Sequence, residues 1–174
     1  MSRKRRLILL ALASLAFVAF FNIGANSEIG EQEAKSITEQ FREMVKDIDA
    51  YGIFLNNFRI ALAMFIPALG VAIGLFSAYS TGLVFKALVV TTPELAGLPP
   101  LLVLATPFGI MEVISYGIAM SQSGILLHSI LKKEGFRPVI IPTLIQIGIV
   151  SALLLAGAFI EYYMIRTAME RVQL

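Results

Sequence analysis

Four predominantly apolar segments constrain the fold of this chain more than any other feature. They cover residues 7–23, 53–79, 110–131 and 139–163, and each is long enough for most or all of a membrane-spanning helix. Only 15% of the residues are charged, whereas a soluble domain carries about 25%. We therefore expect an all-α, polytopic bundle of transmembrane helices with about four spans, possibly five.

The residue inventory leaves little for catalysis or cofactor binding. The chain has no cysteine and one histidine, and its net charge is only +2. It contains no P-loop, G-x-G-x-x-G, G-x-S-x-G or H-E-x-x-H motif. We therefore expect no enzymatic activity, no cofactor, no metal site and no nucleic-acid partner.

The N-terminal segment is basic and then apolar. Arg3, Lys4, Arg5 and Arg6 precede the apolar residues 7–23, a pattern shared by signal peptides and first transmembrane helices. Residues 23–25 form no clean small-residue cleavage site, so we interpret residues 1–25 as a retained membrane anchor. The positive-inside rule then predicts a protein of the cell membrane with a cytoplasmic N-terminus.

Residues 26–52 differ sharply from the rest of the chain. Between residues 28 and 49 there are seven acidic and three basic residues, and Asn26 or Ser27 is a candidate helix cap. Apolar side chains recur at helical spacing, which predicts an extramembrane amphipathic helix with one apolar stripe; the stripe comprises Ile37, Phe41, Met44 and Ile48. It packs on the membrane domain or docks another protein. Adsorption to lipid is disfavoured because the polar face is acidic.

Residues 53–174 form the expected helical membrane domain. Pro67 should kink a helix that runs to about residue 79, and Gly70 and Gly74 form a small-residue packing motif. Residues 80–100 contain breaks that indicate a half-helix, an interfacial segment or a re-entrant segment. Four spans place both termini in the cytoplasm and residues 132–137 outside. An extra span within residues 80–104 would instead place residues 132–137 inside and the C-terminus outside. We favour the four-span arrangement.

Glu112 is the most informative single residue, because a carboxylate at membrane depth is costly. It caps the helix that starts after Gly109, or forms a buried ion pair with Arg59 or Lys86, or belongs to a proton or ion pathway. Ser115, Tyr116 and Ser123 extend a polar stripe from it along the same helix. Asn56 and Asn57 either cap their helix or hydrogen-bond to the broken backbone near Pro107. His128 is expected at the interface.

Two segments together resemble the stage II sporulation protein M family of membrane proteins. The first is residues 53–61, containing Asn56 and Asn57, followed by Gly70, Gly74 and Gly82. The second is Pro107-Phe108-Gly109-Ile110-Met111-Glu112, followed by Ser123-Gly124-Ile125-Leu126. The family pattern has an asparagine, then Pro-His-Gly-x-x-Glu, then a small-residue helix. The matching residues are Asn57, Pro107, Gly109, Glu112 and Gly124.

The resemblance departs from the family at Phe108, where the pattern has histidine. It therefore implies a shared architecture rather than shared chemistry, and a non-enzymatic scaffold that recruits or assembles other proteins. The expected partners are membrane lipid together with protein partners, further copies of this chain, or both. The alternative is a transport or channel component that uses broken helices and Glu112.

Overall fold

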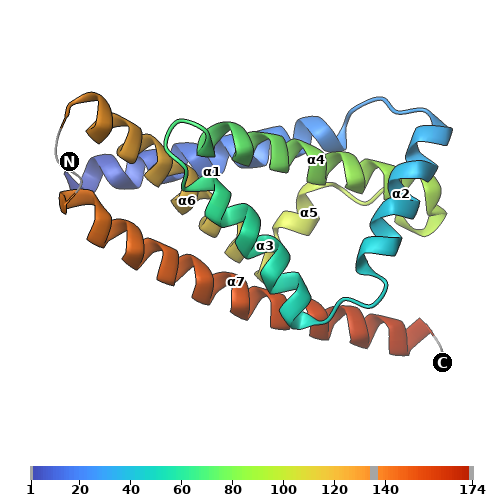
Figure 1. Cartoon of the computed structure of the whole chain (residues 1–174). Helices are drawn as coiled ribbons and strands as arrows, with labels where there is room; N and C mark the ends of the chain where they lie inside the picture. Colours follow the sequence, from blue (N-terminus) through green and yellow to red (C-terminus); the bar gives the residue numbers. More distant parts are fainter. Residues whose placement is uncertain (1, 134–136, 173–174) are drawn as a thin grey trace.

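The computed structural model describes residues 2–133 and 137–172, which are helical with no strand. Figure 1 shows a bundle of long helices with one helix across its end. The elements are α1 (Arg3–Ala25), α2 (Glu31–Val45), α3 (Ala50–Met64), α4 (Gly70–Thr91), the 3₁₀ helix η1 (Pro93–Leu95), α5 (Leu101–Leu104), α6 (Pro107–Leu131) and α7 (Arg137–Val172).

Four helices are long and apolar enough to cross a membrane: α1, α4, α6 and residues Pro138–Thr167 of α7. Their outward faces carry large apolar side chains, such as Leu15 at 66% exposure and Leu144 at 62%. Such a surface would aggregate in water, but it is normal for helices that face lipid tails. The predicted all-α transmembrane bundle is therefore confirmed.

The chain reverses direction at Pro67, where the sequence had predicted only a kink. The helix ends at Met64, and α4 starts at Gly70 and runs back alongside the bundle (Figure 1). Proline has no amide proton to continue the helix, and Ala68 adopts a left-handed φ of 68°, which reverses the chain. The prediction of one kinked helix reaching residue 79 is therefore wrong, because α3 and α4 form a helical hairpin.

The tip of this hairpin lies inside the bundle. The Ser123 hydroxyl donates a 2.7 Å hydrogen bond to the carbonyl oxygen of Ile66 in the tip. Ser123 lies eight residues before the end of α6 at Leu131, which is about 12 Å along a helix. The hairpin thus enters the bundle from the end that carries α2 and returns to that same end (Figure 1).

The basic segments gather at the other end of the bundle. Arg5 and Arg6 of α1 line the same cavity as Lys132, which caps α6. The sequence-based arrangement placed residues 132–137 on the side opposite to the N-terminus, whereas the structure brings Lys132 to the same end of the bundle as Arg5 and Arg6. The α3–α4 hairpin, not an extra span within residues 80–104, explains why the two basic segments lie at the same end. The two termini lie at opposite ends (Figure 1).

Glycines allow α1 and α4 to approach each other closely. A Cβ atom at Gly82 would collide with the carbonyl oxygen of Phe21, and one at Gly24 would collide with the carbonyl oxygen of Tyr79. Phe21 itself is fully buried. Because lipid supplies no hydrophobic drive for helix association, such close backbone contact is a main source of packing energy. This contact makes α1 an integral part of the bundle.

Candidate functional site

A polar contact joins α3 to α6 in the middle of the apolar bundle. The side-chain amide of Asn57 donates a 2.6 Å hydrogen bond to Oε1 of Glu112. This distance is short for a hydrogen bond between an amide and an oxygen atom. The contact connects residues that are 55 positions apart, so the fold and not local sequence creates it.

The start of α6 sets the position of Glu112. Thr106 caps the helix, with its hydroxyl accepting a hydrogen bond from the amide of Gly109 at 3.1 Å. Pro107 occupies the first helical turn, where its missing amide proton costs nothing. A Cβ atom at Gly109 would collide with the carbonyl oxygen of Val103, so glycine allows α5 to pack against this turn.

These contacts bear on two of the three expected roles of Glu112, capping and ion pairing, and leave a proton or ion pathway untested. The side chain of Thr106, not that of Glu112, caps the start of α6. The amide of Asn57 is the hydrogen-bond donor described for Glu112, whereas an ion pair with Arg59 or Lys86 was one of the expectations. Asn57 contacts the Glu112 side chain rather than the backbone near Pro107.

Asn56 is exposed, and its amide lies 3.4 Å from the side-chain oxygen of Asn57. It therefore stands beside the Asn57–Glu112 contact without being part of it.

The predicted polar stripe of α6 faces the interior of the bundle. Ser115, Tyr116 and Ser123 are buried, and the Tyr116 ring lies 5.2 Å from the Phe17 ring of α1. Glu161 is a second carboxylate within a candidate span, on helix α7, which packs against α6. Sequence reasoning gave Glu161 no role, although a carboxylate inside a predicted span was a usable signal.

A second polar contact in the core was also missed. The Gln122 side chain is fully buried, and its amide donates a 2.7 Å hydrogen bond to the hydroxyl of Thr143 on α7. Its Oε1 atom has no hydrogen-bond partner among the described residues. A buried amide with one free oxygen is unusual and destabilising, so the remaining contact matters for stability.

The candidate glycines differ in what surrounds them. A Cβ atom at Gly70 would collide with the Met64 carbonyl oxygen, whereas one at Gly74 would meet the flexible side chain of Met120. Gly124 has open space around it. Gly70, Gly74 and Gly82 therefore stand at close contacts within the bundle, and Gly124 does not.

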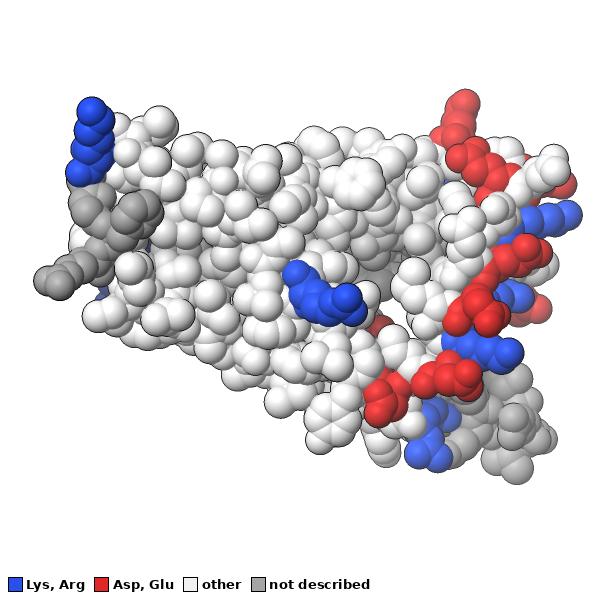
Figure 2. Space-filling model, viewed as in Figure 1, with Lys and Arg blue, Asp and Glu red and all other residues white. Residues whose placement is uncertain are grey.

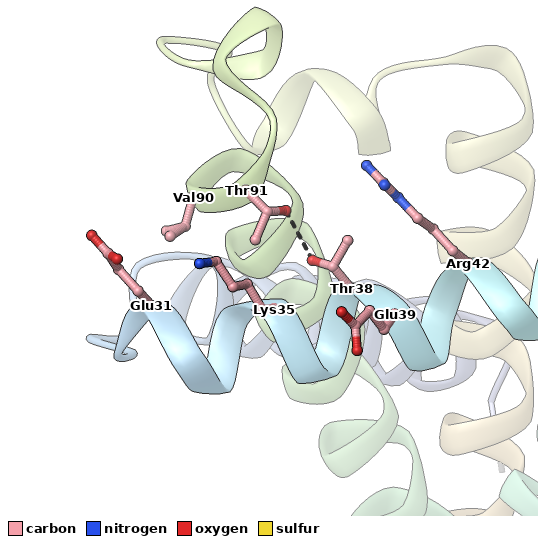
Figure 3. Close-up of a pocket in the computed structure, with 7 residues that line it drawn as sticks. All are labelled: Glu31, Lys35, Thr38, Glu39, Arg42, Val90 and Thr91. Atoms are coloured by element: carbon pink, nitrogen blue, oxygen red, sulfur yellow. Dashed lines mark hydrogen bonds between the residues drawn. The ribbon is translucent and has the colours of Figure 1, made fainter.

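Helix α2 lies across the end of the bundle and packs on α4. Ala34 and Thr38 are buried, and the hydroxyl groups of Thr38 and Thr91 are 3.0 Å apart (Figure 3). Gly30, not Asn26 or Ser27, occupies the N-cap position. Within the predicted apolar stripe the side chains of Ile37, Phe41 and Ile48 are half-buried, and Met44 is 66% exposed.

Charged side chains follow the outer surface of α2. Figure 2 shows acidic side chains concentrated at this end of the molecule, with basic ones between them. A cavity of about 380 Å³ lies where α2 meets α4; Figure 3 shows its lining residues, Glu31, Lys35, Thr38, Glu39, Arg42, Val90 and Thr91. This end is therefore polar and structured, whereas the sides of the bundle are apolar.

Comparison with protein families, with curated proteins and with solved structures finds no match to this chain.

Proposed function

We propose that this chain is a non-enzymatic membrane scaffold or complex subunit, with the architecture of the stage II sporulation protein M family. In this proposal the outer face of α2 is the docking surface for a protein partner. One observation carries it: α2 is held on α4 by buried Ala34 and Thr38, so its acidic residues project from the end of the bundle. A fixed, charged surface favours recognition of a partner with complementary charge.

The charge distribution gives the proposed orientation. The basic residues Arg5, Arg6 and Lys132 share one end of the bundle, and the positive-inside rule assigns that end to the cytoplasm. Helix α2 then lies on the outer side of the cell membrane. The partner we propose is therefore an extracytoplasmic protein or domain with a basic surface.

Site-specific photo-crosslinking in intact membranes tests this docking surface. A photoreactive residue replaces Met44 on α2 or, as a matched control, Leu144 on the lipid-facing side of α7; the two native side chains are 66% and 62% exposed. We expect a discrete protein adduct at Met44 and none at Leu144. The yield of the adduct should fall in the double variant Glu33→Gln/Glu43→Gln and rise in Lys46→Gln.

The outcomes separate the proposals. An adduct of the same mass at both positions, or an adduct whose yield is the same in the charge variants, would contradict docking on α2. An adduct with the mass of two copies of this chain at Leu144 would instead indicate self-association through α7.

A transport role is the second candidate, and the polar contact inside the bundle favours it. Glu112 accepts a hydrogen bond from Asn57 and lies near the start of α6, just after the break that separates α6 from α5; intramembrane carboxylates beside broken helices recur in transporters. Protein reconstituted in vesicles with a pH-sensitive dye tests this role. Transport predicts proton or cation flux that Glu112→Gln abolishes and Asn56→Ala leaves intact. Absence of flux in the unmodified protein would reject this second candidate.

A further inference from the structure

A cavity of about 520 Å³ opens at the basic end of the bundle, between α1, α6 and α7. Its charged residues come from two helices: Arg5 and Arg6 from the first turn of α1, and Lys132 from the end of α6. None of the described residues that line it is acidic. The described lining of the cavity thus gathers positive charge from two helices.

The same cavity has an apolar wall that runs toward the middle of the bundle. Leu9 lies one helical turn deeper than Arg5 on α1, and Ile125 lies two turns before Lys132 on α6. Val139 contributes the third side from α7. Gly124 also lines the cavity, and no atom beyond its neighbours on the same helix lies within 4 Å of the position of its missing Cβ, so the wall is open there.

This combination fits an amphipathic anion. One arginine guanidinium group can donate hydrogen bonds to two oxygens of the same phosphate, and lysine adds a point charge on a flexible side chain. The apolar wall would be a poor surface for a small soluble anion, but it suits a hydrocarbon chain. The volume lies within the range of pockets that hold small organic groups.

We propose that this cavity binds an anionic membrane phospholipid. Its phosphate contacts Arg5, Arg6 and Lys132, and one acyl chain lies along Leu9 and Ile125. The depth agrees with this assignment, because the basic residues stand where the apolar spans begin, at the level of lipid headgroups. The ligand joins α1 to α6 and α7 and is independent of any partner at α2.

Native mass spectrometry of the full chain in detergent, titrated with phosphatidylglycerol or phosphatidylcholine, tests the proposal. The N-terminus offers a matched pair of variants: Arg5→Gln/Arg6→Gln changes two lining residues, and Arg3→Gln/Lys4→Gln changes two that do not line the cavity. Each lining charge should contribute about fivefold to phosphatidylglycerol affinity, so the first variant should lose about 25-fold. The second should lose less than about twofold, because no lipid surface is present to add a general attraction.

A second matched pair comes from the end of α6. Lys132→Gln should weaken phosphatidylglycerol binding about fivefold, whereas Lys133→Gln, which lies outside the lining, should not change it. Equal losses in both members of a pair would show that overall charge, not this cavity, binds the lipid. Equal affinity for phosphatidylcholine would also overturn the proposal. Displacement of phosphatidylglycerol by inorganic phosphate at equal concentration would show a soluble-anion site instead.

Discussion

The hydrogen bond between Asn57 and Glu112 should contribute measurably to the stability of the bundle. In Asn57→Ala the Glu112 carboxylate loses a donor that lies 2.6 Å away. Asn56→Ala is the matched control, because it removes the same side chain one residue earlier, where it is exposed and its amide makes a long 3.4 Å hydrogen bond to Asn57 rather than one to Glu112. The comparison separates the hydrogen bond from any change in helix propensity.

Two kinds of measurement bracket the size of the effect. Hydrogen bonds to charged groups contribute about 1.5–3 kcal/mol in soluble proteins. Hydrogen bonds between transmembrane helices average about 0.6 kcal/mol and reach about 1.7, because the unfolded chain also finds partners. The short distance and the half-buried position favour the upper part of the membrane range, so we expect about 1.5 kcal/mol for Asn57→Ala. Asn56→Ala should cost less than about 0.5 kcal/mol.

A double-mutant cycle checks the assignment to this contact. Asn57→Ala, Glu112→Ala and the double variant are unfolded reversibly by adding SDS to mild-detergent micelles, with helicity followed by circular dichroism. The double variant should be about 1 kcal/mol more stable than the sum of the single losses predicts, because contacting residues are coupled. Strictly additive losses, or equal losses in Asn57→Ala and Asn56→Ala, would refute the reasoning.

Three further predictions concern packing, core polarity and topology. In the same SDS assay, Gly82→Ala should destabilise the bundle by about 1–3 kcal/mol, because the new methyl group meets backbone atoms of α1. Gly74→Ala should cost less, because the side chain of Met120 can move, and Gly124→Ala should be neutral or stabilising. Thr143→Val should cost about 1–3 kcal/mol by leaving the buried amide of residue 122 unpaired, and replacing residue 122 by leucine in that background should recover part of this loss. Reporter fusions should place the N-terminus in the cytoplasm and the C-terminus outside; a cytoplasmic C-terminus would contradict the orientation.

The class of fold could be predicted from the sequence because it depends on composition over whole segments. A run such as residues 7–23 has few alternatives to a membrane helix, and α1 and α7 cover the expected spans. The reversal after Met64 could not be predicted, because Pro67 is compatible with both a kink and a turn. The left-handed conformation of Ala68 decides between them, and alanine adopts it only when surrounding contacts support it.

The candidate site was predicted in part. A carboxylate at position 112 in an apolar helix pointed to a functional or paired group, and Asn57 was already a candidate for bonding between helices. Their direct contact depends on how α3 crosses α6, which no local spacing encodes. Gln122 and Glu161 were not recognised, because both lie within spans whose average hydropathy hides single polar residues.

In the proposed orientation, the α3–α4 hairpin also explains how a chain with four long helices can satisfy the positive-inside rule. If each of α1, α4, α6 and α7 crossed in turn, the basic N-terminus and Lys132 would lie on opposite sides. A hairpin that enters and leaves at the α2 end adds no net crossing, so α1, α6 and α7 alone decide the sides. Both basic segments then share one end, and the acidic helix α2 lies at the other. The break at Pro67 thereby leaves a basic end and an acidic end on opposite sides of the bundle, which is the polarity that the proposed scaffold requires.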